Sequence, residues 1–560
     1  MKNSRRILLF IWIVFVLRGV FYSAVFPIWE GYDEPFHFAY LQQLIHHGEI
    51  PGMSTPMSRE LLQSLHVLPL PWVLSQEDLP QPAFSHEAYW KLSGTERERL
   101  QKQFREIPPS WGEEDSTEKK ISNYETQQMP LYYLVFYFPL KLMPGFSLAL
   151  RVLVLRFLNV LLASCIVPLG YLVATRVLKD KSPALSLMLL IVALPELFID
   201  LSRVGNESLA LVLYTAAVYL ALRIVEGPQN FKYFPWLGVV LSLGLLTKAY
   251  FLTAVPALFP IIVWCYRQWP RERNRLLKFS TLTGAALLII AGPWYWRVHT
   301  LTGSWSGVTD DVALRSLSRW QILAQVPHVN WAGGIVSILL SHVWFGAWSF
   351  LKFNRPVYLF FGLIILLAVL GICRVVLLRL RKNSPDSQAE DRGAIESGKL
   401  LVLLSFYAFF WLGLIYDILL VYIHLGVSAS TGWYMYSLIV PEAILLYLGL
   451  SAVVTKKNRS WILPTLTSLF VLLDLYGLHF LLVPYYTGVI SHVGQNRVAA
   501  AGAGQLIQVG IAEFARRLSI NKPAFLGPAE MIVLWIIFLL ATVFLIFAAF
   551  GLRKASTNLE

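Results

Sequence analysis

Residues 7–27 read ILLFIWIVFVLRGVFYSAVFP, an apolar stretch that follows Lys2, Arg5 and Arg6. A helix needs about 20 consecutive apolar residues to cross a bilayer, and this stretch is long enough. It is not followed by the small-residue cleavage site of a signal peptide. The stretch therefore predicts a retained first transmembrane helix with the basic N-terminus on the cytoplasmic side.

Similar apolar runs continue along the 560-residue chain. Hydrophobic residues make up 56% of it and charged residues 14%, and its mean hydropathy is +0.57. Soluble globular chains carry about 25% charged residues. The sequence therefore predicts an all-α polytopic membrane protein with about twelve transmembrane helices. After the first, the predicted spans are residues 154–176, 183–201, 207–226, 233–250, 251–267, 279–296, 356–378, 399–424, 433–454, 461–484 and 529–552.

The net charge of +13 comes mostly from short segments between these runs. In the twelve-span topology, 24 of the 47 Lys and Arg lie on the side of the N-terminus. The short turns 201–206 and 425–432 on the other side contain only Arg203. Because positive residues mark cytoplasmic loops, we expect both termini in the cytoplasm, and the basic charge does not indicate a nucleic-acid partner. Without an organellar or cleaved signal, we expect the inner (plasma) membrane of a bacterium.

Two further apolar pieces do not fit as spans. Residues 130–143 are too short and predict an interfacial helix on the outer side. Residues 331–350 are long enough, but spanning would place the basic cluster at 374–382 outside, so a re-entrant or interfacial segment is favoured. The remaining outer segments are the loops 28–153, 297–355 and 485–528.

The first outer loop is acidic on a basic protein. Between residues 28 and 126 there are sixteen Asp and Glu against eight Lys and Arg. Directly after the first span comes WEGYDEPFH, residues 29–37. Carboxylates at a membrane surface are partly desolvated, which raises their basicity and suits Asp33 to act as a base on a lipid-borne substrate. The alternative is that Asp33 and Glu34 cap the helix that Pro35 begins.

Other polar residues are predicted at the same outer level. Residues 123–133 (NYETQQMPLYY) join the polar loop to the interfacial helix, although tyrosines at that depth are also typical of the aromatic belt. Lys248 lies near the outer end of the fifth span, and an ammonium group among apolar neighbours is costly unless it meets an anion or water. With Arg297, Lys248 predicts a phosphate site facing the acidic loop. Arg156 stands at the start of the second span, where snorkelling is the alternative.

Several common cofactor motifs are absent from the sequence. It contains no Walker loop, no dinucleotide glycine fingerprint, no Gly-x-Ser-x-Gly and no His or Cys pair with zinc spacing. The protein thus shows no sign of using ATP directly. A divalent metal ion stays open, because Glu34, His37 and Glu125 offer oxygen and nitrogen ligands without a diagnostic spacing.

Several motifs occur in an order that resembles a known superfamily. The run YDEPFHFAY at 32–40 is similar to the acidic motif in the first outer loop of the GT-C membrane glycosyltransferases, above all the protein O-mannosyltransferase and lipid A aminoarabinose transferase branch. Members of that branch continue to a Gly-acid-x-Pro end and a Pro-Pro-Leu-Tyr-Tyr segment. Matching segments here are GEIP at 48–51, MPLYY at 129–133, RFLN at 156–159 and GLLTK at 244–248.

The resemblance covers about residues 7–300. It implies a GT-C-like catalytic module at 1–300, followed by C-terminal transmembrane helices at 301–560. It also implies a transferase that moves one sugar from a polyprenyl-phosphate donor to a glycan, lipid or protein acceptor at the outer face, inverting the anomeric carbon.

The resemblance also implies roles for particular residues. Asp33 is the general base, and Glu34 orients it or helps to hold a metal. Lys248, with Arg297 or Arg156, neutralises the departing lipid phosphate. The acceptor and sugar side is then formed by Tyr124, Glu125, Tyr132, Tyr133 and His37.

Three other functions are weighed against this one. A transporter or flippase would also have twelve spans, but two related halves with discontinuous helices are expected there. A ligase of lipid-linked glycans places key Arg and His residues in a late outer loop, and 485–528 contains His492, Arg497, Arg516 and Arg517. If the protein were a non-catalytic scaffold, replacement of Asp33 would leave its activity and the growth phenotype unchanged.

Overall fold

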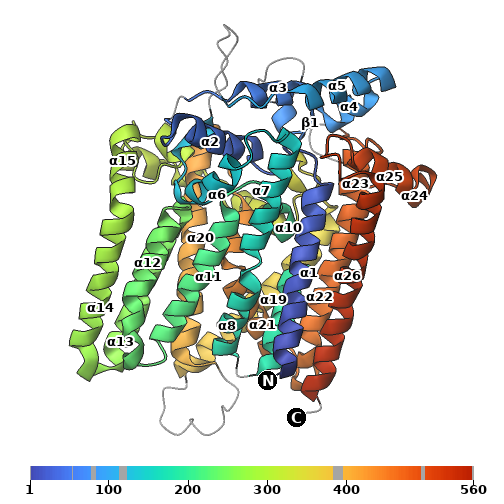
Figure 1. The fold of residues 1–560 in the computed structure, drawn as a ribbon. Helices are drawn as coiled ribbons and strands as arrows, with labels where there is room; N and C mark the ends of the chain where they lie inside the picture. Colours follow the sequence, from blue (N-terminus) through green and yellow to red (C-terminus); the bar gives the residue numbers. More distant parts are fainter. Residues whose placement is uncertain are drawn as a thin grey trace.

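The computed structural model describes residues 2–52, 55–76, 83–111, 123–178, 180–381, 395–493 and 498–557. Long helices lie side by side in one bundle, and the N- and C-termini lie at the same end of it (Figure 1). We call this the terminal end, and the opposite end, which carries most of the short helices, the loop end. The bundle helices are α1 (Lys2–Val25), α7 (Leu148–Ala163), α8 (Ile166–Val177), α9 (Lys181–Ala193), α10 (Pro195–Leu201), α11 (Glu207–Ile224), α12 (Phe234–Leu245), α13 (Ala254–Gln268), α14 (Arg273–Ala286), α15 (Gly292–Thr302), α19 (Arg355–Arg381), α20 (Ser397–Leu425), α21 (Ile439–Val453), α22 (Ile462–Gly477) and α26 (Pro528–Thr557).

Within the described ranges, ten helical segments are long and apolar enough to cross a membrane, or twelve if each of two bent helix pairs is one span. The predicted all-α membrane protein with about twelve spans is therefore confirmed. One bent pair is α9–α10, which turns by 64°. Pro195 begins α10, and a proline lacks the N–H that would continue the helix of the preceding residues.

The predicted span at 233–250 is wrong in its outer part. Helix α12 ends at Leu245, and Lys248 has extended backbone before a 3-10 turn at Ala249–Thr253. The carbonyl of Leu246 accepts the N–H of Leu131, at 2.9 Å. The break therefore places Lys248 between helices and frees a backbone carbonyl to bind the loop-end chain.

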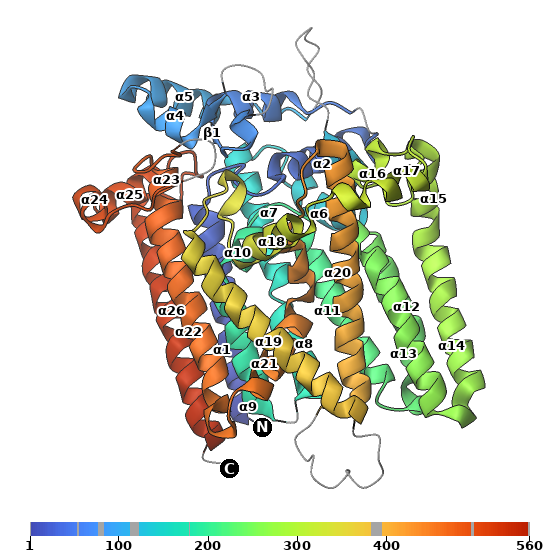
Figure 2. The same ribbon diagram turned by 180° about the vertical axis from the view of Figure 1, so that it is seen from behind.

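The loop end is built from short helices of the three predicted outer loops (Figure 2). Helices α2 and α6 pack on each other, and α6 corresponds to the piece predicted as interfacial. The first loop also holds two parallel two-residue strands. These elements are α2 (Glu34–His47), α3 (Arg59–Val67), β1 (Pro69–Leu70), β2 (Phe84–Ser85), α4 (His86–Lys91), α5 (Gly94–Glu106), α6 (Leu131–Lys141), α16 (Thr309–Ala313), α17 (Arg319–Ala324), α18 (Trp331–Val343), α23 (Val483–Tyr486), α24 (Ala503–Val509) and α25 (Ile511–Leu518).

Helix α18 covers most of residues 331–350, the segment that is predicted to be re-entrant or interfacial. It lies near the loop end, and it is bent by 85° against the helical segment Arg319–His328 (Figure 2). Broken spans and re-entrant loops share this geometry, so the re-entrant or interfacial assignment of 331–350 stays a prediction.

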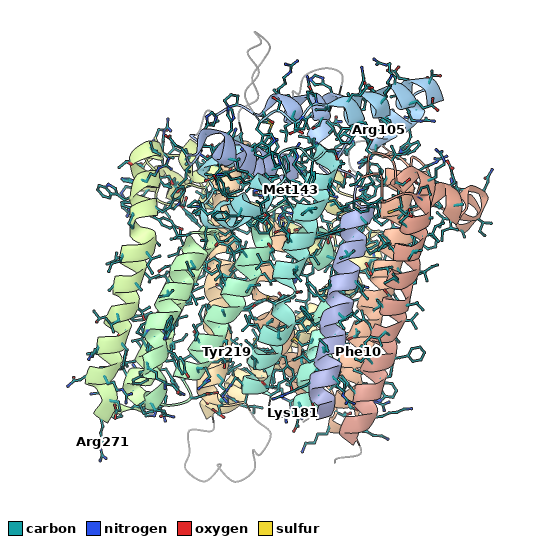
Figure 3. The ribbon with its side chains drawn as sticks, viewed as in Figure 1. Phe10, Arg105, Met143, Lys181, Tyr219 and Arg271 are labelled. Carbon is teal, nitrogen blue, oxygen red and sulfur yellow. The ribbon has the colours of Figure 1, made fainter. Side chains whose placement is uncertain are left out.

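Basic side chains lie at both ends of the bundle. Figure 3 shows Lys181 and Arg271 at the terminal end, Arg105 at the loop end and Phe10 on the outside of α1. Phe10 is 56% exposed, as expected of a side chain that faces lipid. Lys181 and Arg271, two of the basic residues predicted to be cytoplasmic, thus lie at the terminal end.

A buried ion pair ties the first helix to the last ones. Arg18 on α1 donates to Asp474 on α22, at 2.8 Å, and to the hydroxyl of Thr542 on α26, at 3.0 Å. Tyr22 donates to the other oxygen of Asp474. Helix α1 packs along α26, and α9 packs along α22, so the predicted modules 1–300 and 301–560 form one bundle. Their division at residue 300 stays a prediction.

Candidate functional site

The segment from Trp29 to Glu34 leaves α1 and crosses the loop end in a strained conformation. Trp29 and Asp33 have positive φ angles of 72° and 55°, which non-glycine residues rarely adopt. Such strain persists only where the surroundings fix the chain. Here a Cβ on Gly31 would lie 2.4 Å from Cβ of Arg203, and Tyr32 donates to Glu196 at 2.7 Å. Different parts of the fold therefore hold neighbouring residues of this segment.

Glu34 is completely paired. Its carboxylate accepts Nε and Nη2 of Arg156, at 2.7 and 2.5 Å, and the backbone N–H groups of Val204 and Trp29, at 2.9 and 3.2 Å. Arg156 uses its remaining N–H groups on the carbonyls of Ser23, Phe26 and Pro27. Both side chains are at most 1% exposed. In this arrangement Arg156 has no donor left for a phosphate, and Glu34 has no free oxygen for a metal.

Asp33, the residue before Glu34, is only partly buried. Its carboxylate accepts a hydrogen bond from the hydroxyl of Tyr124. Burial raises the pKa of Asp33 above its usual range, and the Tyr124 hydrogen bond opposes the rise. The positive charges of Arg203 and Lys248 also lower this pKa. Asp33 therefore lies within the electrostatic reach of both cations.

Glu125 is the second carboxyl of the site. It lies in the 3-10 turn Tyr124–Gln127, is 7% exposed, and its Oε2 finds no hydrogen-bond partner within the described chain. Burial raises the pKa of Glu125 to about 8, and the negative charge of Asp33 adds to the rise. At neutral pH, Glu125 is therefore protonated beside Asp33.

Lys248 forms the positive part of the site. Its ammonium group donates to Oδ1 of Asn206 at 2.7 Å and forms an ion pair with Glu207. Lys248 is 8% exposed and lies 5.6 Å from the ring centre of Tyr434. An ammonium group has three N–H donors. Within the described part of the chain, two of these are used, which leaves one for a ligand.

Arg203 and Glu207 extend this group of charges, and they were not among the predicted site residues. Arg203 pairs with Glu207 at 2.8 Å and with Asp200 at 2.9 Å, while its Nε has no hydrogen-bond partner among the residues described. The signal in the sequence was the polar run 202–208 between two apolar stretches, which snorkelling also explained. The structure shows that Arg203 is 1% exposed and points inward.

Arg297 lies apart from these contacts. It is partly buried on α15, with its guanidinium 5.3 Å from the ring centre of Trp294. Its positive charge acts on Tyr40, which stacks on Tyr133 with ring centres 3.6 Å apart. Its predicted contact with a donor phosphate stays a prediction.

The remaining predicted residues form a buried aromatic group beside the carboxyls. His37 and Tyr133 are hydrogen-bonded at 2.7 Å, and burial holds the pKa of His37 well below its usual range, so its imidazole is neutral at pH 7. The hydroxyl of Tyr132 accepts from Asn159 at 3.1 Å and from the N–H of Gly205 at 3.2 Å. Tyr132 is therefore occupied in holding the turn before α11.

The site does not present a metal centre. Over the described ranges, no group of three or more His, Cys, Asp and Glu is placed to hold a metal ion. Glu34, one of the ligands considered from sequence, has all of its oxygens paired with Arg156 and the backbone. The described residues thus do not fit a bound divalent ion at this position.

Comparison with known proteins links the central part of this site to one family. The family described as dolichyl-phosphate-mannose-protein mannosyltransferase matches residues 143–296. This range contains Arg203, Glu207 and Lys248, and it ends before Arg297. The resemblance to the GT-C glycosyltransferases predicted from the sequence is confirmed by this match. No curated protein matches the chain.

Among solved structures, the chain is similar to the apo crystal structure of the oligosaccharyltransferase of Archaeoglobus fulgidus. The two share 11% identity with a TM-score of 0.34. The match covers 98% of this chain and 56% of the other, so this chain spans little more than half of that protein's length. We infer nothing about function from a likeness this distant.

Proposed function

We propose that this chain, a membrane glycosyltransferase of the GT-C type, moves one sugar from a polyprenyl-phosphate donor to a hydroxyl group of a glycan, lipid or protein. The observation that carries the proposal is the placement of Asp33, whose carboxylate accepts a hydrogen bond from Tyr124 and lies within the electrostatic reach of Lys248 and Arg203. A base for the acceptor and a cation for the departing phosphate are the two groups that such a transfer needs.

Asp33 acts as the general base. Its carboxylate takes the proton of the acceptor hydroxyl as the oxygen attacks the anomeric carbon. Tyr124 holds the carboxylate by a hydrogen bond, and Glu125, being protonated, offers a hydrogen-bond donor without competing for that proton. Glu34 serves the site indirectly, because its pairing with Arg156 fixes the segment that carries Asp33.

Lys248 acts on the leaving group. The bond from the anomeric carbon to the phosphate oxygen breaks, and its electron pair leaves with the lipid phosphate. The ammonium group of Lys248, already held by Asn206 and Glu207, needs no reorganisation to meet the developing charge. Attack from one side and departure from the other invert the anomeric carbon in a single displacement.

The chemistry is proposed for the loop end, at the outer face of a bacterial inner membrane. The enrichment of basic residues at the terminal end supports a cytoplasmic position for both termini. A lipid-linked donor reaches this site from the bilayer, and it is already activated by its phosphate. This agrees with a sequence that has no ATP-binding motif.

The test compares wild type with Asp33→Asn in membranes, at matched amounts of folded protein. Radiolabelled sugar is followed from a panel of polyprenyl-phosphate sugars into lipid, glycan and protein fractions. We expect transfer by wild type and a loss of about two to four orders of magnitude in the variant. Equal transfer by both proteins would remove Asp33 from the mechanism. Absence of transfer from every donor would overturn the proposal and favour transport of a lipid-linked glycan.

A further inference from the structure

A second strained loop packs against the segment that carries Asp33. In the connection between α18 and α19, Gly346, Ala347 and Phe350 have φ angles of 69°, 58° and 53°. A non-glycine residue in this region of φ is strained and persists only where its surroundings fix the chain. Two such residues within four positions therefore require strong fixation from outside the loop.

The fixation comes from two buried carboxylates. Oε2 of Glu196 accepts the N–H groups of Phe345 and Gly346, at 2.8 and 3.3 Å. Oε1 of Glu30 accepts the N–H of Ser349, at 3.1 Å, and the backbone carbonyl of Glu30 accepts the N–H of Trp348, at 3.3 Å. Four backbone donors of the 345–349 loop thus bind carboxylate or carbonyl oxygens on neighbouring segments.

Glu30 also binds a third part of the fold. Its Oε2 is 2.9 Å from Nε2 of His86, the first residue of α4, and both side chains are 0% exposed. The Asp33 segment, the 345–349 loop and the start of α4 meet at this single carboxylate. The proposed mechanism does not use Glu30.

Two routes lead from Glu30 to the proposed base. The first runs along the backbone, because Glu30 is three residues before Asp33 in the segment whose φ angles are strained at both positions 29 and 33. The second runs through Trp348, whose ring centre is 6.2 Å from that of Phe36. Phe36 in turn lies 4.1 Å from the ring of Tyr124, the hydrogen-bond donor to Asp33.

We infer that Glu30 is a positioning residue, which fixes Asp33 and Tyr124 by joining their segments to the 345–349 loop and to His86. The inference rests on the proposed function of Asp33. Lys248 is held separately, by Asn206 and Glu207. Loss of Glu30 should therefore disturb the base while leaving the affinity for the donor phosphate unchanged.

The experiment uses the full-length protein with Glu30→Gln. Glutamine keeps the size of the side chain but removes the negative charge and replaces one acceptor oxygen by an amide nitrogen, which cannot accept a hydrogen bond from Ser349 or His86. Because misplacement of a reacting group by about 1 Å costs about 100-fold in rate, we expect kcat to fall about 10- to 100-fold. The KM for a radiolabelled polyprenyl-phosphate hexose should stay within about twofold, since that substrate's phosphate contacts are unchanged.

A matched control separates positioning from general stability. Asp474 is also 0% exposed, but it lies on α22 within the bundle, where it accepts from Arg18 and Tyr22 of α1. Asp474→Asn should lower thermal stability while keeping kcat per folded molecule. His86→Ala supplies a second approach to Glu30, and His86→Gln, which retains a donor, should restore most of the lost kcat.

Hydrogen exchange provides a readout that does not need activity. In Glu30→Gln, we expect faster exchange of the amides at 29–37 and 345–349, with the rest of the protein unchanged. Wild-type kcat in Glu30→Gln and His86→Ala, or unchanged exchange at 29–37, would overturn the inference. If wild type transfers no sugar, the proposed function fails, and the exchange data still decide whether Glu30 fixes the Asp33 segment.

Discussion

Asp33 and Glu34 are adjacent carboxylates with opposite surroundings. Glu34 accepts four hydrogen bonds and is sealed against Arg156, whereas Asp33 is partly buried and accepts from Tyr124. A fully paired buried charge has no capacity left for a ligand, while an incompletely paired one can bind or abstract a proton. The number of unused acceptors or donors thus separates residues that hold the fold from candidates for chemistry.

The same contrast divides the cations. Arg156 donates all of its N–H groups to oxygen atoms of the protein. Lys248 and Arg203 keep donors that the described residues do not use. Each prediction below changes one member of the paired or of the unpaired set.

Asp33→Asn should give the largest effect. The asparagine cannot accept a proton, so sugar transfer should fall by about two to four orders of magnitude. The thermal stability should change little, because Asp33 forms no buried ion pair with the residues that the structure describes. The measurement is the initial rate of transfer together with the melting temperature in detergent. A large drop in melting temperature with unchanged activity per folded molecule would reverse the roles of Asp33 and Glu34.

Glu34→Gln should act on folding instead. It leaves the Arg156 guanidinium buried without its counter-charge, which costs about 3–5 kcal/mol. We expect a low yield and a low melting temperature, with activity per folded molecule closer to wild type than that of Asp33→Asn. Denaturation in mixed micelles checks the stability. A fully stable but inactive variant would place Glu34 in the chemistry.

Lys248→Met should weaken the stabilisation of the departing phosphate. Removing one charged donor of this kind costs about 10²- to 10³-fold in kcat. Methionine preserves the length of the side chain, and Glu207 can still pair with Arg203. Steady-state kinetics with varied donor give the result. Arg297→Met is the comparison, since Arg297 contacts Trp294 and should have the smaller effect if Lys248 alone meets the phosphate.

Glu125→Gln tests the protonated carboxyl through pH. The pKa of about 8 is above the ordinary value of 4.5 for a glutamate, so the folded protein holds a proton that the unfolded chain has lost. The stability gained in this way is fully present below about pH 4.5 and is lost as the pH rises to about 8. The melting temperature of the variant should depend less on pH between pH 5 and 9. An unchanged slope would contradict protonation of Glu125.

Tyr124→Phe should have the smallest effect. In the wild type, the hydrogen bond from Tyr124 lowers the pKa of Asp33. The variant lacks this bond, so the pKa of Asp33 should rise. A larger fraction of Asp33 is then protonated at any acidic pH, and the acid limb of the rate profile should move to higher pH. At alkaline pH the rate should approach that of wild type. A uniform loss of rate at every pH would instead give Tyr124 a direct contact with the acceptor.

The sequence predicted the fold well, because apolar runs of membrane length report directly on the spans. The sequence did not predict where a helix breaks inside an apolar run, because composition carries no signal for the break. The runs at 183–201 and 233–250 have the right length, yet the first bends before Pro195 and the second ends at Leu245. Whether a helix continues through such a run depends on partners for the freed carbonyls, and these lie in distant segments.

For the site, the sequence grouped Asp33, Glu125 and Lys248 by their proximity to the membrane surface, and in the structure their charges act on one another. Their roles in a reaction stay predictions. The sequence could not distinguish Arg156 from Lys248, because each is one basic residue beside an apolar run. The difference is made by Glu34, which is 122 positions from Arg156 in the chain. Pairing at that separation is a property of the fold and not of the local pattern.

The Arg18–Asp474 pair also has a consequence for how the protein is made. Arg18 belongs to α1, and its partner on α22 is synthesised 456 residues later. At about 5–20 residues per second, that delay is on the order of 20 to 90 s. During this time Arg18 must stay at the insertion machinery, at the lipid headgroups or with a temporary partner, since an unpaired arginine inside the bilayer is costly. Helix α1 thus takes its final position only after α22 has been made.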